Sequence, residues 1–314
     1  MEFHEHTLEN GLQVIAECNP RAYSAALGFF VNAGARDEND ANNGVSHFLE
    51  HMVFKGTPRR TAAEVNRELD ELGSQSNAYT SEENTVYYAT VLPEFLEPAL
   101  DLLADLLRPS LRAEDFETEK QVILEEIFKY DDQPPFGANE KGMAAYFGRH
   151  PLARPVLGTL ASVTGLTPEA MRAYFEQRYS PANIALVACG KIDFPTLVKL
   201  AERSCGGWKP CDAPRELTTE ETLEGFTVIT KEHATQAYAV QLSAGPTAED
   251  DDRYAARIAT TIFGDDSGSR LYWELVDTGL AEYAATGSYE FQNAGLNMAY
   301  LSSEPEHMLG NLAF

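Results

Sequence analysis

The segment from residue 44 to residue 56 constrains the fold more than any other, because it sets ionisable side chains in an apolar helix. Glu50 and His51 follow His47 by three and four positions, so one face of an α-helix carries all three. The surrounding residues are apolar on nearly every side, which predicts burial. Ionisable groups on a buried helix are costly unless they are paired or bind a metal. The segment therefore predicts a buried helix with a metal site on one face.

The types of these three residues point to zinc chemistry. Neutral imidazole is a preferred zinc ligand, and a catalytic zinc site needs about three protein ligands and one open position. Glu50 stands between the two histidines as a proton acceptor beside that position. The order reverses the commoner His-Glu-x-x-His motif. The alternative is a chance pattern on a solvated face, which the apolar neighbours disfavour.

A third ligand is predicted from residues 113–131, which form a strong helical pattern. Glu119 and Glu126 are seven positions apart and lie together at the flank of an apolar stripe, whereas Glu125 points away and is expected to be solvated. The stripe consists of Phe116, Ile123, Ile127 and Tyr130. Two histidines and one glutamate would complete a zinc site, with the glutamate supplied by a second helix packed on the first. A helix merely rich in surface glutamate is the alternative.

The chain also resembles a known family through several separated motifs that occur in the family's order. It is similar to the pitrilysin family of zinc metallopeptidases, the inverzincins, and is closest to the branch of the mitochondrial and bacterial processing peptidases. The motifs are residues 47–57, 77–81, 85–88, 119–126, 150–152, 157–159, 269–272 and 279–283. The resemblance extends from about residue 3 to the end of the sequence.

The resemblance implies a role for each residue of the metal site. By this likeness His47, His51 and Glu126 are the ligands of Zn²⁺, and Glu50 is the general base. Glu119 is implied to be a carboxylate that supports the catalytic site without binding the metal.

The resemblance also implies contacts with substrate. Asn77, Ala78 and Tyr79 stand in a predicted strand that is either an ordinary internal strand or an edge strand pairing with an extended peptide. The likeness favours the edge strand. Arg270 and Tyr283 are implied to contact substrate, although the residues alone would equally fit a packing pair at a helix end.

Periodicity and turn signals predict a mixture of helices and strands. Asn10-Gly11 is a strong hairpin signal, and Thr61 with Glu64 forms a capping box. The predicted helices are residues 44–56, 61–72, 94–107, 113–131, 136–148, 167–178, 194–205 and 253–263, with another beginning near 304. The predicted strands are residues 3–8, 12–17, 23–33, 75–80, 84–92, 184–188, 227–230 and 236–242.

The order of these elements predicts an α+β fold with a duplicated architecture. The resemblance implies a pitrilysin-like or processing-peptidase-like α/β roll, in which helices pack on one side of a mixed sheet, and the second repeat is expected to hold no ligands. The expected domains are residues 1–208 with the zinc site, a linker at 209–222, and a second repeat at 223–314. The second repeat is much shorter than the first, so we expect it to be incomplete and the sequence to be truncated.

Composition narrows the classes of partner. A net charge of −25 disfavours nucleic acid as a partner and favours basic peptides, although a plain acidic surface explains it equally well. The four cysteines have no metal-binding spacing. No signal peptide or membrane-spanning run is recognised, which predicts a cytoplasmic protein without a membrane partner.

Together these features predict a zinc-dependent endopeptidase that hydrolyses short or unfolded peptides. The alternative is a non-catalytic, peptide-binding partner subunit of a processing-peptidase-like complex. The retention of Glu50 with all the ligands favours the enzyme. A homodimer, or a heterodimer with a related subunit, is the expected assembly.

Overall fold

The computed structural model describes residues 2–218 and 222–314, which divide into two compact units. Unit 1 comprises residues 1–127 and 155–215, and unit 2 comprises residues 128–154 and 216–314. Residues 128–154, which the predicted domain boundaries assign to the first domain, therefore group with the C-terminal part of the chain. Residues 219–221 of the predicted linker lie outside the described residues. The predicted domains themselves, as two repeats, remain a prediction.

A mixed sheet forms the centre of unit 1, and six of its strands are described, in the order β1-β2-β6-β3-β5-β4. They are β1 (Glu2–Thr7), β2 (Gln13–Cys18), β3 (Ala25–Val31), β4 (Gln75–Thr80), β5 (Thr85–Val91) and β6 (Ile184–Gly190). The β2–β6 pair is parallel and the other pairs are antiparallel. Gly11, with a φ of +92°, closes the predicted hairpin between β1 and β2.

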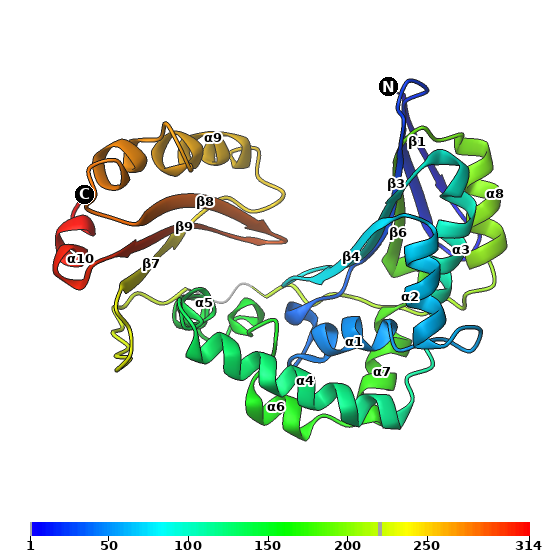
Figure 1. The fold of residues 1–314 in the computed structure, drawn as a ribbon, viewed down its shortest axis with the longest axis horizontal. Coiled ribbons are helices and arrows are strands. Elements are labelled where there is room, and N and C mark those ends of the chain that lie inside the picture. The colour runs from blue at the N-terminus through cyan, green and yellow to red at the C-terminus, as the bar shows by residue number, and fades with distance from the viewer. Residues whose placement is uncertain (1, 219–221) are drawn as a thin grey trace. The chain divides into compact units, whose positions relative to one another are not determined.

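Helices pack on one side of this sheet, as Figure 1 shows for α3 and α8. The buried side chains of the strands, such as Phe29, Tyr87 and Leu186, face them and form one large core. The helices of unit 1 are α1 (Val45–Val53), α2 (Ala62–Glu71), α3 (Leu96–Leu106), α4 (Ala113–Asp132, which runs past the unit boundary), α6 (Leu160–Gly165), α7 (Pro168–Arg178) and α8 (Phe194–Cys205). The predicted α+β roll is confirmed.

Unit 2 is built on a smaller antiparallel sheet, described in the order β7-β9-β8. Helix α9 packs on β8, and α5 packs on β7, where Gly142 leaves room for Val240. The elements are α5 (Ala138–Phe147), β7 (Ala237–Ala244), α9 (Arg253–Gly264), the π-helix η5 (Tyr272–Val276), β8 (Tyr283–Phe291), β9 (Ala294–Ser303) and α10 (Pro305–Asn311). The hairpin of β8 and β9, which turns at Asn293 with a φ of +56°, was not anticipated from the sequence.

The predicted strand at residues 227–230 is wrong, because these residues form no strand. In unit 1 the corresponding strand, β2, joins β3 only through β6, which lies between them. Among the described residues of unit 2 no strand takes the place of β6 beside β7. A segment without a neighbouring ladder has nothing to bond with, and its apolar side chains stay exposed, as the 74% exposure of Val228 shows.

Candidate metal centre

Helix α1 begins at a tight turn that a buried carboxylate holds. Gly44 precedes the helix with a φ of +93°, and a Cβ there would meet the carbonyl oxygen of Leu157 at 2.7 Å. Glu38, from the preceding loop, accepts hydrogen bonds from the backbone N–H groups of Gly44 and Ser46, each at 2.7 Å, and from the side chain of Asn43 at 2.8 Å. Glu38 thus caps the helix that carries the histidines.

Helix α1 is held between the sheet and other helices. Phe48 is fully buried and stacks on Phe116 of α4, with 4.5 Å between the ring centroids. Ser46 Oγ lies 2.6 Å from the hydroxyl of Tyr174 on α7. The Phe48–Phe116 contact holds α4 against α1 and brings a glutamate of α4 to the histidine face of α1.

His47, His51 and Glu126 converge as the sequence predicts. One potential ligand atom from each lies within 4.8 Å of the others. Glu126 Oε2 is 3.9 Å from His47 Nε2 and 3.7 Å from His51 Nε2. Ligand atoms about 2.0–2.1 Å from a tetrahedral zinc lie about 3.3 Å apart. Two imidazoles and one carboxylate at this spacing fit a catalytic zinc ion with one open position.

The carboxylate of Glu119 contacts His51 at Nδ1, and Lys55 pairs with that carboxylate. Glu119 Oε1 lies 2.9 Å from His51 Nδ1, and Glu119 Oε2 lies 2.6 Å from Lys55 Nζ. Burial raises the pKa of Glu119, but the hydrogen bonds and charges of Lys55 and His51 outweigh it and hold that pKa below its usual value. An ionised Glu119 fixes the tautomer of His51, so that Nε2 presents its lone pair toward Glu126.

His47 is kept in its metal-binding, neutral form by burial and not, among the described residues, by a neighbouring carboxylate at Nδ1. Burial, with a smaller contribution from the charge of His51, lowers the pKa of His47 to about 4. The imidazole is therefore neutral near pH 7, which is the form that binds a metal. Its Nδ1 is buried without a hydrogen-bond partner in the part of the chain that the structure describes. Only one of the two histidines thus has a carboxylate behind it.

Glu50 lies beside the two histidines and is anchored by a threonine. Thr80 Oγ1, at the end of β4, donates a hydrogen bond of 2.6 Å to Glu50 Oε2. Burial raises the pKa of Glu50, and the hydrogen bond from Thr80 opposes part of that rise. A carboxylate with a raised pKa is suited to accepting and returning a proton.

The helical pattern of α4 is largely confirmed. Phe116, Ile123 and Ile127 are buried, and Glu125 is exposed, as predicted. Tyr130, which we placed on the same stripe, is 51% exposed. It lies beyond Ile127, where unit 1 ends, so the core of unit 1 does not cover it.

The residues predicted to bind a peptide backbone lie on an edge strand. Strand β4 pairs with β5 on one side, and no described strand pairs with its other side. Asn77 and Tyr79 are exposed, whereas Ala78 packs against the core. The geometry suits the addition of an extended peptide, which is the role predicted for Asn77, Ala78 and Tyr79.

Arg270 and Tyr283 belong to unit 2. Arg270 is exposed, and Tyr283 begins β8 with its hydroxyl 3.5 Å from Asp266 Oδ1. Their proposed contact with substrate stays a prediction.

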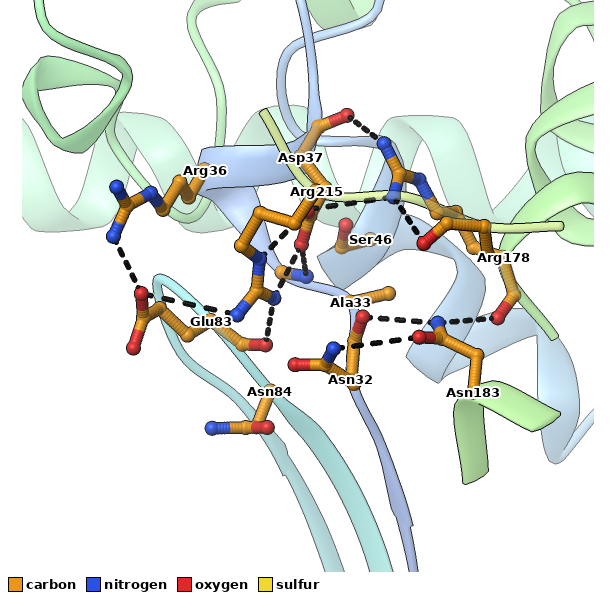
Figure 2. Close-up of polar contacts among 12 residues, drawn as sticks. Asn32, Ala33, Arg36, Asp37, Ser46, Glu83, Asn84, Arg178, Asn183 and Arg215 are labelled. Carbon is orange, nitrogen blue, oxygen red and sulfur yellow. Dashed lines mark hydrogen bonds and ion pairs between the residues drawn. The ribbon is translucent and has the colours of Figure 1, made fainter. Parts of the chain in front are cut away.

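A buried ion network, which sequence reasoning missed, joins Asp37, the residue before Glu38, to Arg178 and Arg215 (Figure 2). The side chain of Asp37 is fully buried and accepts two hydrogen bonds from Arg215, at 2.9 and 2.7 Å, while Arg178 Nη1 lies 3.5 Å from Asp37 Oδ1. Arg215 also donates to the carbonyl oxygen of Glu83, in the turn between β4 and β5. The network ties the loop before α1 to that turn and to the last residue of unit 1. The members of this network are far apart in the sequence, so no local sequence pattern predicts their contacts.

Comparison with known proteins identifies the family. Residues 13–160 match the family model described as Insulinase (Peptidase family M16), and residues 165–313 match the one described as Peptidase M16 inactive domain. The chain belongs to peptidase family M16, the family of pitrilysin and insulinase. The predicted family is thus confirmed, and so is the prediction that the chain is a zinc metalloprotease.

Individual relatives agree with this assignment. An uncharacterized zinc protease of Mycobacterium tuberculosis is 35% identical over 307 residues, which cover 96% of this chain and 70% of that protein. The beta subunit of the mitochondrial-processing peptidase of Caenorhabditis elegans is 32% identical over 277 residues, covering 88% of this chain and 60% of the subunit. A protease from Helicobacter pylori has the same fold, with a TM-score of 0.90 at 22% identity, covering 99% of this chain and 78% of that one.

The structure offers no candidate for a membrane-spanning helix: within residues 2–218 and 222–314, none combines the required length with sufficient apolar character.

Proposed function

We propose that this metalloprotease is an endopeptidase that cleaves short or unfolded peptides, with zinc held by His47, His51 and Glu126 and with Glu50 as the general base. The observation that carries the proposal is the convergence of the three potential ligands within 4.8 Å, on the face of α1 that also carries Glu50. The donor set is one that catalytic zinc sites use.

The chain's own residues account for the movement of protons. Zinc in such a site lowers the pKa of a coordinated water to about 7 and polarises a substrate carbonyl. Glu50 takes a proton from the attacking water and afterwards delivers it to the nitrogen of the leaving amine. Glu119 stays ionised beside His51 and holds that ring in place while the charge at the site changes.

The form of the substrate follows from the edge strand. A peptide that adds to β4 must offer its backbone in an extended conformation over several residues, which a folded domain does not do. Asn77 and Tyr79 alternate with Ala78, so a peptide at this edge would meet their side chains on one face. The proposal therefore assigns short or unfolded peptides as substrates.

Pairing with a related subunit is a second proposal. A relative of this chain is named as the beta subunit of a mitochondrial-processing peptidase, which supports an assembly of two related chains. A purely peptide-binding partner subunit has less support, because Glu50 and the three ligands are all present.

The test is the cleavage of an internally quenched peptide by the zinc-loaded chain. We expect cleavage that a chelator abolishes and added zinc restores. Glu50→Gln should keep its zinc and lose about a hundred- to ten-thousandfold in kcat, because the amide cannot take up the proton. The matched control, Glu125→Gln, removes an exposed carboxylate of α4 and should cleave normally. Normal turnover by Glu50→Gln would refute the assignment of the base.

A further inference from the structure

We infer that Thr80 is the positioning residue for the proposed base, and that it couples this base to the strand proposed to receive the substrate. The inference rests on the proposed function of Glu50 and β4. It goes beyond that function because it assigns a task to a side chain that neither binds the metal nor transfers a proton.

The first observation is the contact itself. Thr80 Oγ1 donates to Glu50 Oε2 at 2.6 Å, the distance expected of a hydroxyl donating to an ionised carboxylate. The carboxyl torsion of a glutamate has a broad, shallow preference, so a free Glu50 would not hold one orientation. One oxygen is fixed by Thr80. The other, Oε1, accepts no hydrogen bond from any described residue, and it is the oxygen left to receive the proton.

The second observation is the direction of the side chain. Along β4 the exposed side chains are Gln75, Asn77 and Tyr79, and the alternate ones point to the helix layer. Ala78 packs on the core from that side, and Thr80 follows it two residues later. The hydroxyl therefore points toward α1, while the outer edge of the same strand stays open to a peptide.

The third observation is that the backbone of Thr80 is firmly held. Thr80 pairs with Thr85 across the ladder, at the last position before the turn. Ser81 closes this turn through its N–H and its hydroxyl, both donating to the carbonyl oxygen of Asn84, at 2.8 and 3.1 Å. The β-branched side chain further restricts the torsion that aims the hydroxyl. A donor whose backbone and side-chain torsion are both restricted is suited to orienting a catalytic carboxylate.

Because β4 carries both the proposed peptide edge and the anchor of the base, a peptide that aligns on β4 is aligned with Glu50 by the same strand. Removing the hydroxyl should leave peptide binding intact and disorder the base. Thr80 should therefore affect kcat and not KM.

The test compares Thr80→Val, which keeps the shape and loses the donor, with Thr80→Ser, which keeps the donor. Thr90→Val is the control, because Thr90 lies on the same sheet, opposite Gln75, and has no contact with Glu50. With the quenched peptide we expect Thr80→Val to lose about ten- to hundredfold in kcat, with KM changed less than about threefold and zinc content unchanged. Thr80→Ser and Thr90→Val should stay within about threefold of the parent chain.

Crystal structures of the same zinc-loaded variants give a second readout that does not depend on activity. We expect one orientation of the Glu50 carboxylate in the parent chain and in Thr80→Ser, and a rotated or divided one in Thr80→Val. An unchanged kcat or an unmoved Glu50 in Thr80→Val would overturn the inference, and so would a loss confined to KM. If the parent chain cleaves no peptide, the proposed function fails, and the position of Glu50 alone then decides whether Thr80 orients it.

Discussion

The two units of this chain share part of their order of elements, but among the described residues only unit 1 brings together a set of potential metal ligands. In unit 1 a strand, a helix and a hairpin follow one another as β3, α1 and β4–β5, and the strands lie in the order β3-β5-β4. In unit 2 the elements β7, α9 and β8–β9 follow one another in the same way, in the order β7-β9-β8. Helix α9 stands where α1 does, yet its sequence contains no histidine, cysteine or acidic residue.

The surroundings of the two helices differ as much as their sequences. Helix α1 is covered by α4 and α7, and burial lowers the pKa of His47 to about 4. On α9, Ile258 is 63% exposed and Ile262 is 61% exposed. The sheet and its helix are therefore only a scaffold. The chemistry requires ligand residues together with a second layer of helices that removes water from them and supplies Glu126.

The largest expected difference between the helices is in packing. Phe48→Ala should lower the free energy of unfolding of unit 1 by about 3–5 kcal/mol, because it empties a fully buried site against Phe116. Ile258→Ala on α9 should change stability by less than about 1 kcal/mol. Urea unfolding measures both losses when each unit keeps its own tryptophan. Phe48→Ala is followed through Trp208 in a Trp273→Phe background, and Ile258→Ala is followed through Trp273 in a Trp208→Phe background. Similar losses in both variants would show that α1 is no better covered than α9.

The next effect is the pH dependence that burial of His47 creates. Its pKa falls from 6.5 to about 4 on folding, so the unfolded chain binds the proton more tightly. The contribution of neutral His47 to the free energy of unfolding is complete above pH 6.5 and is lost as the pH falls through 4. For the zinc-free protein this contribution is about 3 kcal/mol. His47→Leu should lack this part of the loss. Unfolding curves of both proteins between pH 7 and pH 4, in the presence of chelator, give the comparison, and parallel profiles would contradict it.

A smaller effect is expected at the carboxylate behind His51. Glu119→Gln should weaken zinc binding by about ten- to hundredfold, because the amide cannot accept from His51 and Lys55 as an ionised carboxylate does. Competition with a chelator of known affinity measures it. Glu117→Gln, an exposed position on the same helix, is the control. Equal affinities in the two variants would leave Glu119 with no role at the metal.

The sequence predicted those parts of the site that follow from local geometry. Helical spacing placed His47, Glu50 and His51 on one face, and the wheel of residues 113–131 separated Glu125 from Glu126. Contacts between elements that are distant in the sequence could not be predicted from it. The bond from Thr80 to Glu50 depends on how β4 packs on α1, and the Arg215–Asp37 pair joins residues 178 positions apart. The wrong strand at residues 227–230 has the same cause, because a strand needs a neighbour that its own residues do not reveal.

The zinc content of Glu126→Gln, compared with that of Glu125→Gln, tests the central claim most directly. The two variants change adjacent carboxylates of α4 by the same few atoms, and only one of them faces the histidines of α1. The account predicts about one zinc per chain in Glu125→Gln and most of it lost from Glu126→Gln under the same dialysis. Equal zinc contents in the two variants would contradict it and would place the third ligand elsewhere.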